Sequence, residues 1–67
     1  MQKLTFNTTK REVTLVDNTG LTIYSQQNVP TVKVMDRHYE VFVEDFDGKK
    51  IPVLRVPISN TNMFIEK

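Results

Sequence analysis

Few residues in this chain are of the types that carry acid–base or metal chemistry. The sequence has no cysteine and a single histidine, His38, which stands in a polar stretch with Asp36 and Arg37. Histidine is the side chain that ordinarily titrates near neutral pH, but no serine or cysteine stands in a recognisable nucleophile context. A zinc site would need carboxylates beside His38, and no such spacing is present. The sequence therefore predicts a protein that is not an enzyme and that holds no metal or cofactor.

One acidic segment begins like a calcium-binding loop. Asp45 and Asp47 alternate and are followed by Gly48, but Lys49 and Lys50 stand where further ligands would be needed. Asp-Gly is also the dipeptide that most favours a two-residue β-hairpin turn, because both positions need a positive φ. With only two glycines in the chain, a glycine-rich phosphate loop is excluded. We therefore interpret this segment as a turn.

Residues 39–56 form the predicted central hairpin, with β-branched and aromatic residues on both sides of that turn. A turn at Asp47-Gly48 would pair Phe46 with Lys49, Asp45 with Lys50, Glu44 with Ile51, Val43 with Pro52, Phe42 with Val53, Val41 with Leu54, Glu40 with Arg55 and Tyr39 with Val56. One face, expected to be core, then carries Tyr39, Val41, Val43, Pro52, Leu54 and Val56. Proline lacks the N–H that a neighbouring strand needs, so the second strand should be a sheet edge, or carry a bulge, at Pro52.

The other face of this hairpin is unusually apolar for a surface exposed to water. It has an apolar centre and a charged rim of Glu40, Glu44, Lys49 and Arg55, which is typical of a protein interface or a second packed layer. The predicted partner-binding residues are Phe42, Phe46, Ile51, Val53 and Arg55. The alternative is that the amino-terminal hairpin covers this face as part of the core.

The rest of the chain also alternates with the period of β-strands. Further short strands are expected at residues 3–6, 11–16, 21–25, 31–35 and 63–65, and no segment has the spacing of an amphipathic helix. The sequence predicts one all-β domain over residues 1–67. It would be a small antiparallel barrel or sandwich of five to seven short strands, SH3-like or OB-like.

The amino-terminal hairpin is predicted from a second glycine-containing turn. Gly20 fits the left-handed position of a three-residue loop with a bulge. Beyond it, Leu21 and Ile23 are expected on the same face as Leu15, with Tyr24 on the opposite face.

Composition limits the location and assembly of the chain. The amino terminus lacks the apolar run of a signal peptide, and no 18 consecutive residues are apolar, so we expect a cytoplasmic protein without a membrane contact. A 67-residue domain has thin stability without disulfides, which raises the expectation of a homo-oligomer. In its asparagine- and threonine-rich, cysteine-free composition the chain resembles small accessory proteins encoded by bacteriophages, although no motif carries this resemblance.

Two functions remain open at this point. The first is a non-enzymatic interaction module, an adaptor or inhibitor, that binds a partner protein through an apolar sheet face or edge. The second is a small nucleic-acid-binding barrel using Tyr24, Phe42, Lys49, Lys50 and Arg55, in which bases stack on aromatic rings over a basic groove. The net charge of +1 and a pI of about 8.1 give this second function weak support.

Overall fold

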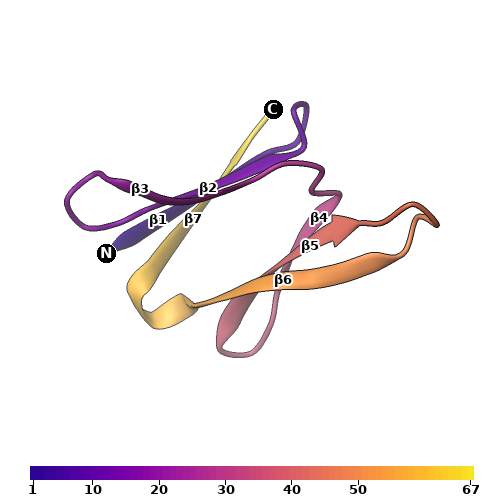
Figure 1. Ribbon diagram of the computed structural model, residues 1–67. Helices are drawn as coiled ribbons and strands as arrows, with labels where there is room; N and C mark the ends of the chain where they lie inside the picture. Colours follow the sequence, from indigo (N-terminus) through magenta and orange to yellow (C-terminus); the bar gives the residue numbers. More distant parts are fainter.

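The computed structural model describes residues 1–67 and shows an all-β chain of two sheets (Figure 1). The strands are β1 (Gln2–Asn7), β2 (Glu12–Val16), β3 (Thr22–Gln26), β4 (Thr31–Val34), β5 (His38–Glu44), β6 (Lys50–Pro57) and β7 (Thr61–Glu66), with a 3-10 turn, η1 (Ile58–Asn60), before β7. The four-stranded sheet has the order β3-β2-β1-β7, and the three-stranded sheet has the order β4-β5-β6. The prediction of an all-β fold with short strands is confirmed.

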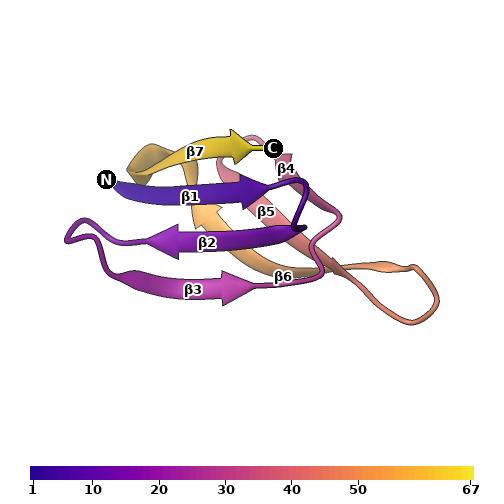
Figure 2. The same ribbon diagram turned by 90° about the horizontal axis from the view of Figure 1, so that it is seen from above.

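The two sheets lie one over the other with their strands crossing obliquely (Figure 2), and they are not closed into a barrel. All neighbouring strands are antiparallel except β1 and β7, which run parallel. The expectation of an entirely antiparallel fold is therefore wrong at the carboxyl-terminal strand. β7 follows β6 through η1 and crosses from one sheet to the other, which brings it beside β1 in the same direction.

The core lies between the two sheets and is small. Alternate residues of β1 and β2 point inward from the four-stranded sheet, and alternate residues of β5 and β6 point inward from the other. The buried hydrophobic residues are Leu4, Phe6, Val13, Leu15, Val29, Val41 and Val56. The predicted core face of the central hairpin is confirmed at Val41 and Val56, with Tyr39, Val43 and Leu54 packed against them.

The two long hairpins end in the same kind of turn, which the sequence predicts correctly at Gly20 only. In β5–β6 the Asp45 N–H donates to the Lys49 carbonyl at 2.9 Å, the Gly48 N–H donates to the Asp45 carbonyl at 3.0 Å, and φ at Gly48 is 77°. The two-residue turn predicted at Asp47-Gly48 is therefore wrong. The Asp45 carboxylate favours the longer loop, because Oδ1 accepts hydrogen bonds from the Asp47 and Lys49 N–H groups at 2.9 and 2.8 Å.

A bulge in β6 restores the predicted pairing of β5 and β6 farther from this turn. Near the turn the pairs are one residue away from the prediction, so Glu44 lies opposite Lys50, Val43 opposite Ile51 and Phe42 opposite Pro52. Val53 has no partner, and beyond it the predicted pairs Val41/Leu54, Glu40/Arg55 and Tyr39/Val56 are all present. As predicted, the strand that contains Pro52 is a sheet edge, and it also carries a bulge. Pro52 itself lies on the outer face with Phe42 and not, as expected, in the core.

A second bulge reverses the predicted faces of β3. Tyr24 lies opposite Leu15, Thr22 lies opposite Val16, and Ile23 between them has no partner. As a result Tyr24 packs against the core, while Leu21 and Ile23 are exposed. The expectation that Leu21 and Ile23 lie beside Leu15 is wrong. The bulge places Tyr24 opposite Leu15, where a strand without the extra residue would place Ile23. Leu21 lies opposite Asp17 at the turn, outside the core.

His38, which the sequence places in a polar stretch before the central hairpin, is the first residue of β5 and lies opposite Pro57. No helix in the structure has the length and apolar character needed to cross a membrane.

Candidate interaction site

The outer face of the three-stranded sheet holds two of the predicted partner-binding residues, Phe42 and Arg55. Successive residues of a strand point to opposite faces, so Phe42 points away from the core that its neighbour Val41 enters. Glu40, two residues before Phe42 in β5, lies on the same outer side and is opposite Arg55. The four-stranded sheet packs against the Val41 side, so the alternative that the amino-terminal hairpin covers Phe42 is wrong.

Charged side chains form a row across this outer face. Lys33 of β4, Glu40 of β5 and Arg55 of β6 lie side by side in the register. Arg55 Nε donates to Glu40 Oε2, and the Glu40 side chain is 8% exposed while that of Arg55 is 68% exposed. Lys33 Nζ lies 5.2 Å from the centre of the Phe42 ring, within the range of a cation–π contact. Phe42 is half-buried, with Lys33 over its ring.

The remaining predicted residues are spread over other surfaces. Ile51 lies opposite Val43 and therefore on the inner side of the sheet, 40% exposed beyond the end of the core. Val53 is the bulged residue of β6 and is 41% exposed at the edge. The structure therefore brings Phe42 and Arg55 together on the outer face and does not bring Ile51 onto it.

Phe46 is the most exposed large hydrophobic residue of the chain. It stands in the β5–β6 turn, which projects beyond the four-stranded sheet (Figures 1 and 2), and its relative exposure is 109%. We call residues 44–50 the hairpin arm. Every residue from Phe46 to Lys50 is exposed, so nothing else in the chain covers the aromatic ring.

The base of the hairpin arm is tied to the rest of the molecule at Glu44. The Asn28 side-chain amide donates to the Glu44 carbonyl at 2.8 Å, and Arg11 forms an ion pair with the Glu44 carboxylate at 3.4 Å. Asn28 and Arg11 both have a positive φ, of 60° and 55°. The Val29 N–H donates to the Arg11 carbonyl, which joins these two segments directly. The arm therefore leaves the body from a fixed base, with its own turn held by Asp45.

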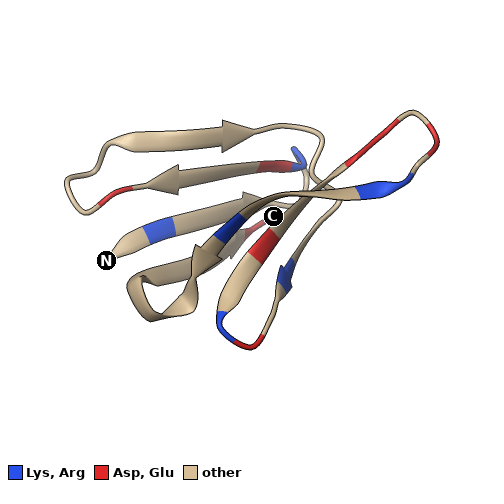
Figure 3. Cartoon of the chain, turned by 60° about the horizontal axis from the view of Figure 1, so that its bottom comes forward, with Lys and Arg blue, Asp and Glu red and all other residues tan.

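The residues predicted for nucleic-acid binding do not share one surface. Tyr24 belongs to the other sheet, where burial raises the pKa of its phenol and its hydroxyl donates to Gln26 Oε1 at 3.1 Å. Lys50 lies opposite Glu44 at the base of the arm. The acidic residues of this hairpin lie on β5 and in the turn, and the basic residues lie on β6 and at its start (Figure 3). Opposite charges therefore face each other across the two strands, as at Glu44/Lys50 and Glu40/Arg55.

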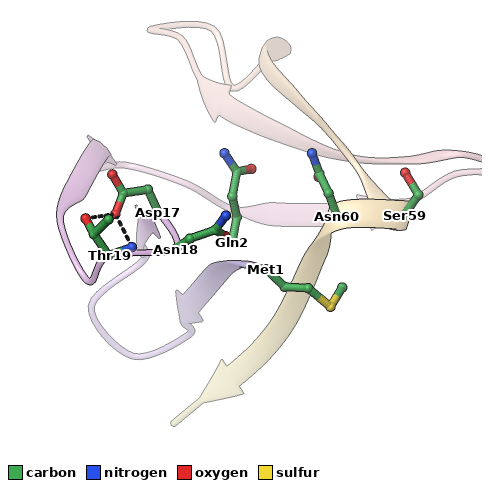
Figure 4. A pocket seen from close by; sticks show the side chains of 7 residues that line it. All are labelled: Met1, Gln2, Asp17, Asn18, Thr19, Ser59 and Asn60. Atoms are coloured by element: carbon green, nitrogen blue, oxygen red, sulfur yellow. Dashed lines mark hydrogen bonds between the residues drawn. The ribbon is translucent and has the colours of Figure 1, made fainter.

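A polar pocket of about 460 Å³ was not anticipated from the sequence. It lies between the β2–β3 turn, the start of β1 and η1 (Figure 4), and its lining consists of Met1, Gln2, Asp17, Asn18, Thr19, Ser59 and Asn60. Hydrogen bonds from the Thr19 hydroxyl, and then from the Leu21 and Thr19 backbone N–H groups, lower the pKa of Asp17. These bonds belong to the turn itself, so they account for the carboxylate without a ligand. The signal in the sequence, Asp17-Asn18-Thr19-Gly20, predicts only the turn.

The other residues considered for acid–base or metal chemistry lie apart from one another. His38 is half-buried, and its Nε2 is buried without a hydrogen-bond partner. No three His, Cys, Asp or Glu residues lie together in an arrangement that would hold a metal ion. Asp45 and Asp47, which begin like a calcium loop, form the hairpin turn described above.

No protein-family model, curated protein or solved structure matches this chain.

Proposed function

We propose that this protein is a non-enzymatic interaction module, an adaptor or inhibitor, that binds a partner protein through the hairpin arm. Phe46 is the anchor of this interaction, and the outer face around Phe42 and Arg55 extends the contact. A small accessory protein of a bacteriophage would fit this role.

The observation that carries the proposal is a comparison of Phe46 with its equivalent in the other hairpin. The β2–β3 turn has the same hydrogen bonds as the β5–β6 turn, with Asn18 at the place of Phe46. Both turns depend on an aspartate at the first position and a glycine at the last. A polar residue serves the fold equally well at the second position, so folding does not explain a phenylalanine there. Aromatic residues are enriched among the anchors of protein interfaces.

The surroundings of Phe46 indicate the chemistry of the partner. The Asp45 carboxylate is engaged by the turn, whereas Asp47 and Lys49, which follow Phe46 in the same turn, are exposed. An anchor of this kind fits an apolar pocket on the partner that excludes water from the ring, with a polar rim that meets these two charges. The fixed base at Glu44 lowers the entropy that the arm loses on binding.

The second function, a nucleic-acid-binding barrel of the SH3-like or OB-like class, has less support. Base stacking needs aromatic rings next to free cations on one surface. Tyr24 packs against the core, the Arg55 guanidinium is paired with Glu40, and Lys33 stands over Phe42. Salt separates the two functions, because affinity based on phosphate contacts falls steeply with added salt and an apolar anchor does not show this dependence.

A photo-crosslinking amino acid placed at the two equivalent turn positions tests the proposal. In extracts of the source cell, we expect the probe at position 46 to form a discrete crosslinked product with one protein. The probe at position 18 is the matched control, since it has the same backbone geometry, and should give no such product. Equal labelling from both positions, or a crosslinked product that contains nucleic acid, would contradict the proposal.

A further inference from the structure

The four edge strands of the two sheets differ in how well they are protected from pairing with another strand. An exposed edge presents free N–H and C=O groups, and proteins block such edges with bulges, prolines, charges or short strands. β3 carries the bulge at Ile23, and β6 carries the bulge at Val53 together with Pro52. β4 has only four residues, follows Pro30 directly and has Lys33 near its centre.

β7 has none of these protections. It has six residues, pairs with β1 without a bulge and contains no proline, and its only charge is Glu66 at the end. Its side chains Phe64 and Ile65 are 47% and 54% exposed. The chain has ten exposed large hydrophobic residues against seven buried ones, so a further apolar contact would be stabilising.

The hydrogen bonds of β7 identify which backbone groups are free. The Glu66 carbonyl accepts from the Thr8 N–H on the β1 side, and the Thr61 N–H donates within η1 on the opposite side. N–H and C=O groups of one residue point the same way and alternate along a strand, so those of Met63 and Ile65 point to the open edge. Neither residue makes a backbone bond outside the strand pairs, and β7 pairs only with β1.

We propose that β7 pairs antiparallel with β7 of a second copy, which joins the two four-stranded sheets into one continuous sheet. The register that places Phe64 opposite Phe64 of the second copy also places Met63 opposite Ile65, so the free backbone groups of both chains meet. Outward-facing residues then meet outward-facing residues, as a continuous sheet requires. This interface is separate from the hairpin arm and does not depend on the proposed function.

The sequence of β7 is complementary to itself in this register. Phe64 forms an aromatic pair across the two-fold axis, which stabilises a sheet through cross-strand packing. Glu66 faces Asn62 of the second copy and lies in the same row as Lys3 of that copy, because Lys3 is the neighbour of Asn62 in β1. No like charges face each other, which favours a second copy over an unrelated strand as the occupant.

The molar mass of the wild-type protein, measured by sedimentation from low micromolar to near-millimolar concentration, should rise from monomer to dimer. Over the same range, amide hydrogen exchange should slow at Met63 and Ile65. A monomer at every concentration would overturn the proposal. A dimer in which these two amides exchange as fast as in the monomer would also overturn it, since association would then use another surface.

The matched variants Ile65→Lys and Ile23→Lys separate this edge from general surface hydrophobicity. Both residues are about half exposed on the outer strands of the same sheet, so both variants should fold. A charge at the centre of the paired edge should weaken the dimer by about 30-fold or more, the factor expected for a central interface residue. Ile23→Lys should leave it unchanged. Equal dimerisation by both variants would contradict the proposal.

Discussion

The β2–β3 and β5–β6 hairpins have the same turn but place different residues on it. In each, an aspartate N–H donates to the carbonyl four residues later at 2.9 Å, and a glycine of positive φ closes the loop. Between them the first turn has Asn18 and Thr19, and the second has Phe46 and Asp47. The comparison shows which positions the fold determines and which are free for function.

The hairpins also differ in what their strands cover. Leu15, two residues before the first turn, is 4% exposed and forms part of the core. Val43 is at the equivalent position before the second turn, is only partly buried, and marks the place where the core ends. The β2–β3 hairpin therefore packs against the core up to its turn, while the β5–β6 hairpin extends beyond the core as the hairpin arm.

The largest expected difference between the hairpins is the cost of truncating these equivalent residues. Leu15→Ala should lower the free energy of unfolding by about 2–5 kcal/mol, because it removes buried methyl groups and leaves a cavity. Val43→Ala should cost about 1 kcal/mol, since the side chain is partly in water already. Urea unfolding of both variants measures the difference. Equal costs would show that the core extends into the arm.

The cost of replacing the turn glycine, the next largest effect, should be the same in both hairpins. Gly20 and Gly48 have φ values of 91° and 77°, and an added Cβ would meet no atom within 4 Å at either position. Valine resists a positive φ, so Gly20→Val and Gly48→Val should each cost more than about 1 kcal/mol through the backbone alone. Thermal unfolding of the two variants checks this. A negligible cost at Gly48 alone would mean that the turns are not equivalent.

These two turns also show how far the sequence predicts the fold. Period-two alternation predicts the strands and the core face of Val41, Leu54 and Val56, because burial on one face of a strand follows from local geometry. The turn at Gly20 is predicted correctly. At Gly48 the sequence offers two aspartates, and a two-residue turn and a longer Asp45 turn both satisfy the local preferences.

The bulges and the parallel strand could not be predicted in the same way. An unpaired Ile23 or Val53 is stable only because the opposite sheet determines which neighbours must face the core. The place of β7 beside β1 depends on the path of the chain through η1, and no residue of β7 encodes a direction of pairing. For the candidate site, the apolar character of Phe42 and Phe46 was visible in the sequence, but the bulge and the longer turn decided that they lie on separate surfaces.

A smaller difference concerns the aspartates. The Thr19 hydroxyl donates to Asp17 Oδ1 at 2.6 Å and is the largest cause of the lowered pKa of Asp17. In the second turn, Asp47 stands in the place of Thr19 and has no hydroxyl to donate to Asp45. A lowered pKa in the folded state means that this contribution to stability is complete above the ordinary value of 3.8 and is lost as the pH falls through the folded value.

Thr19→Val should therefore raise the pKa of Asp17 towards its ordinary value and reduce the loss of stability on acidification. An NMR titration of the Asp17 carboxyl in both proteins measures the shift. If the pKa of Asp17 is the same in the variant, the hydroxyl is not the main cause of the lowering.

The exchange of the two free turn residues tests the central claim most directly. Phe46→Asn gives the second turn the residue of the first, and Asn18→Phe does the reverse; each should change the free energy of unfolding by less than about 0.5 kcal/mol, as surface substitutions usually do. The affinity for the partner crosslinked at position 46 is then measured by titration calorimetry. We expect Phe46→Asn to weaken binding by about 30-fold or more and Asn18→Phe to leave it unchanged. Unchanged affinity in Phe46→Asn would contradict the account.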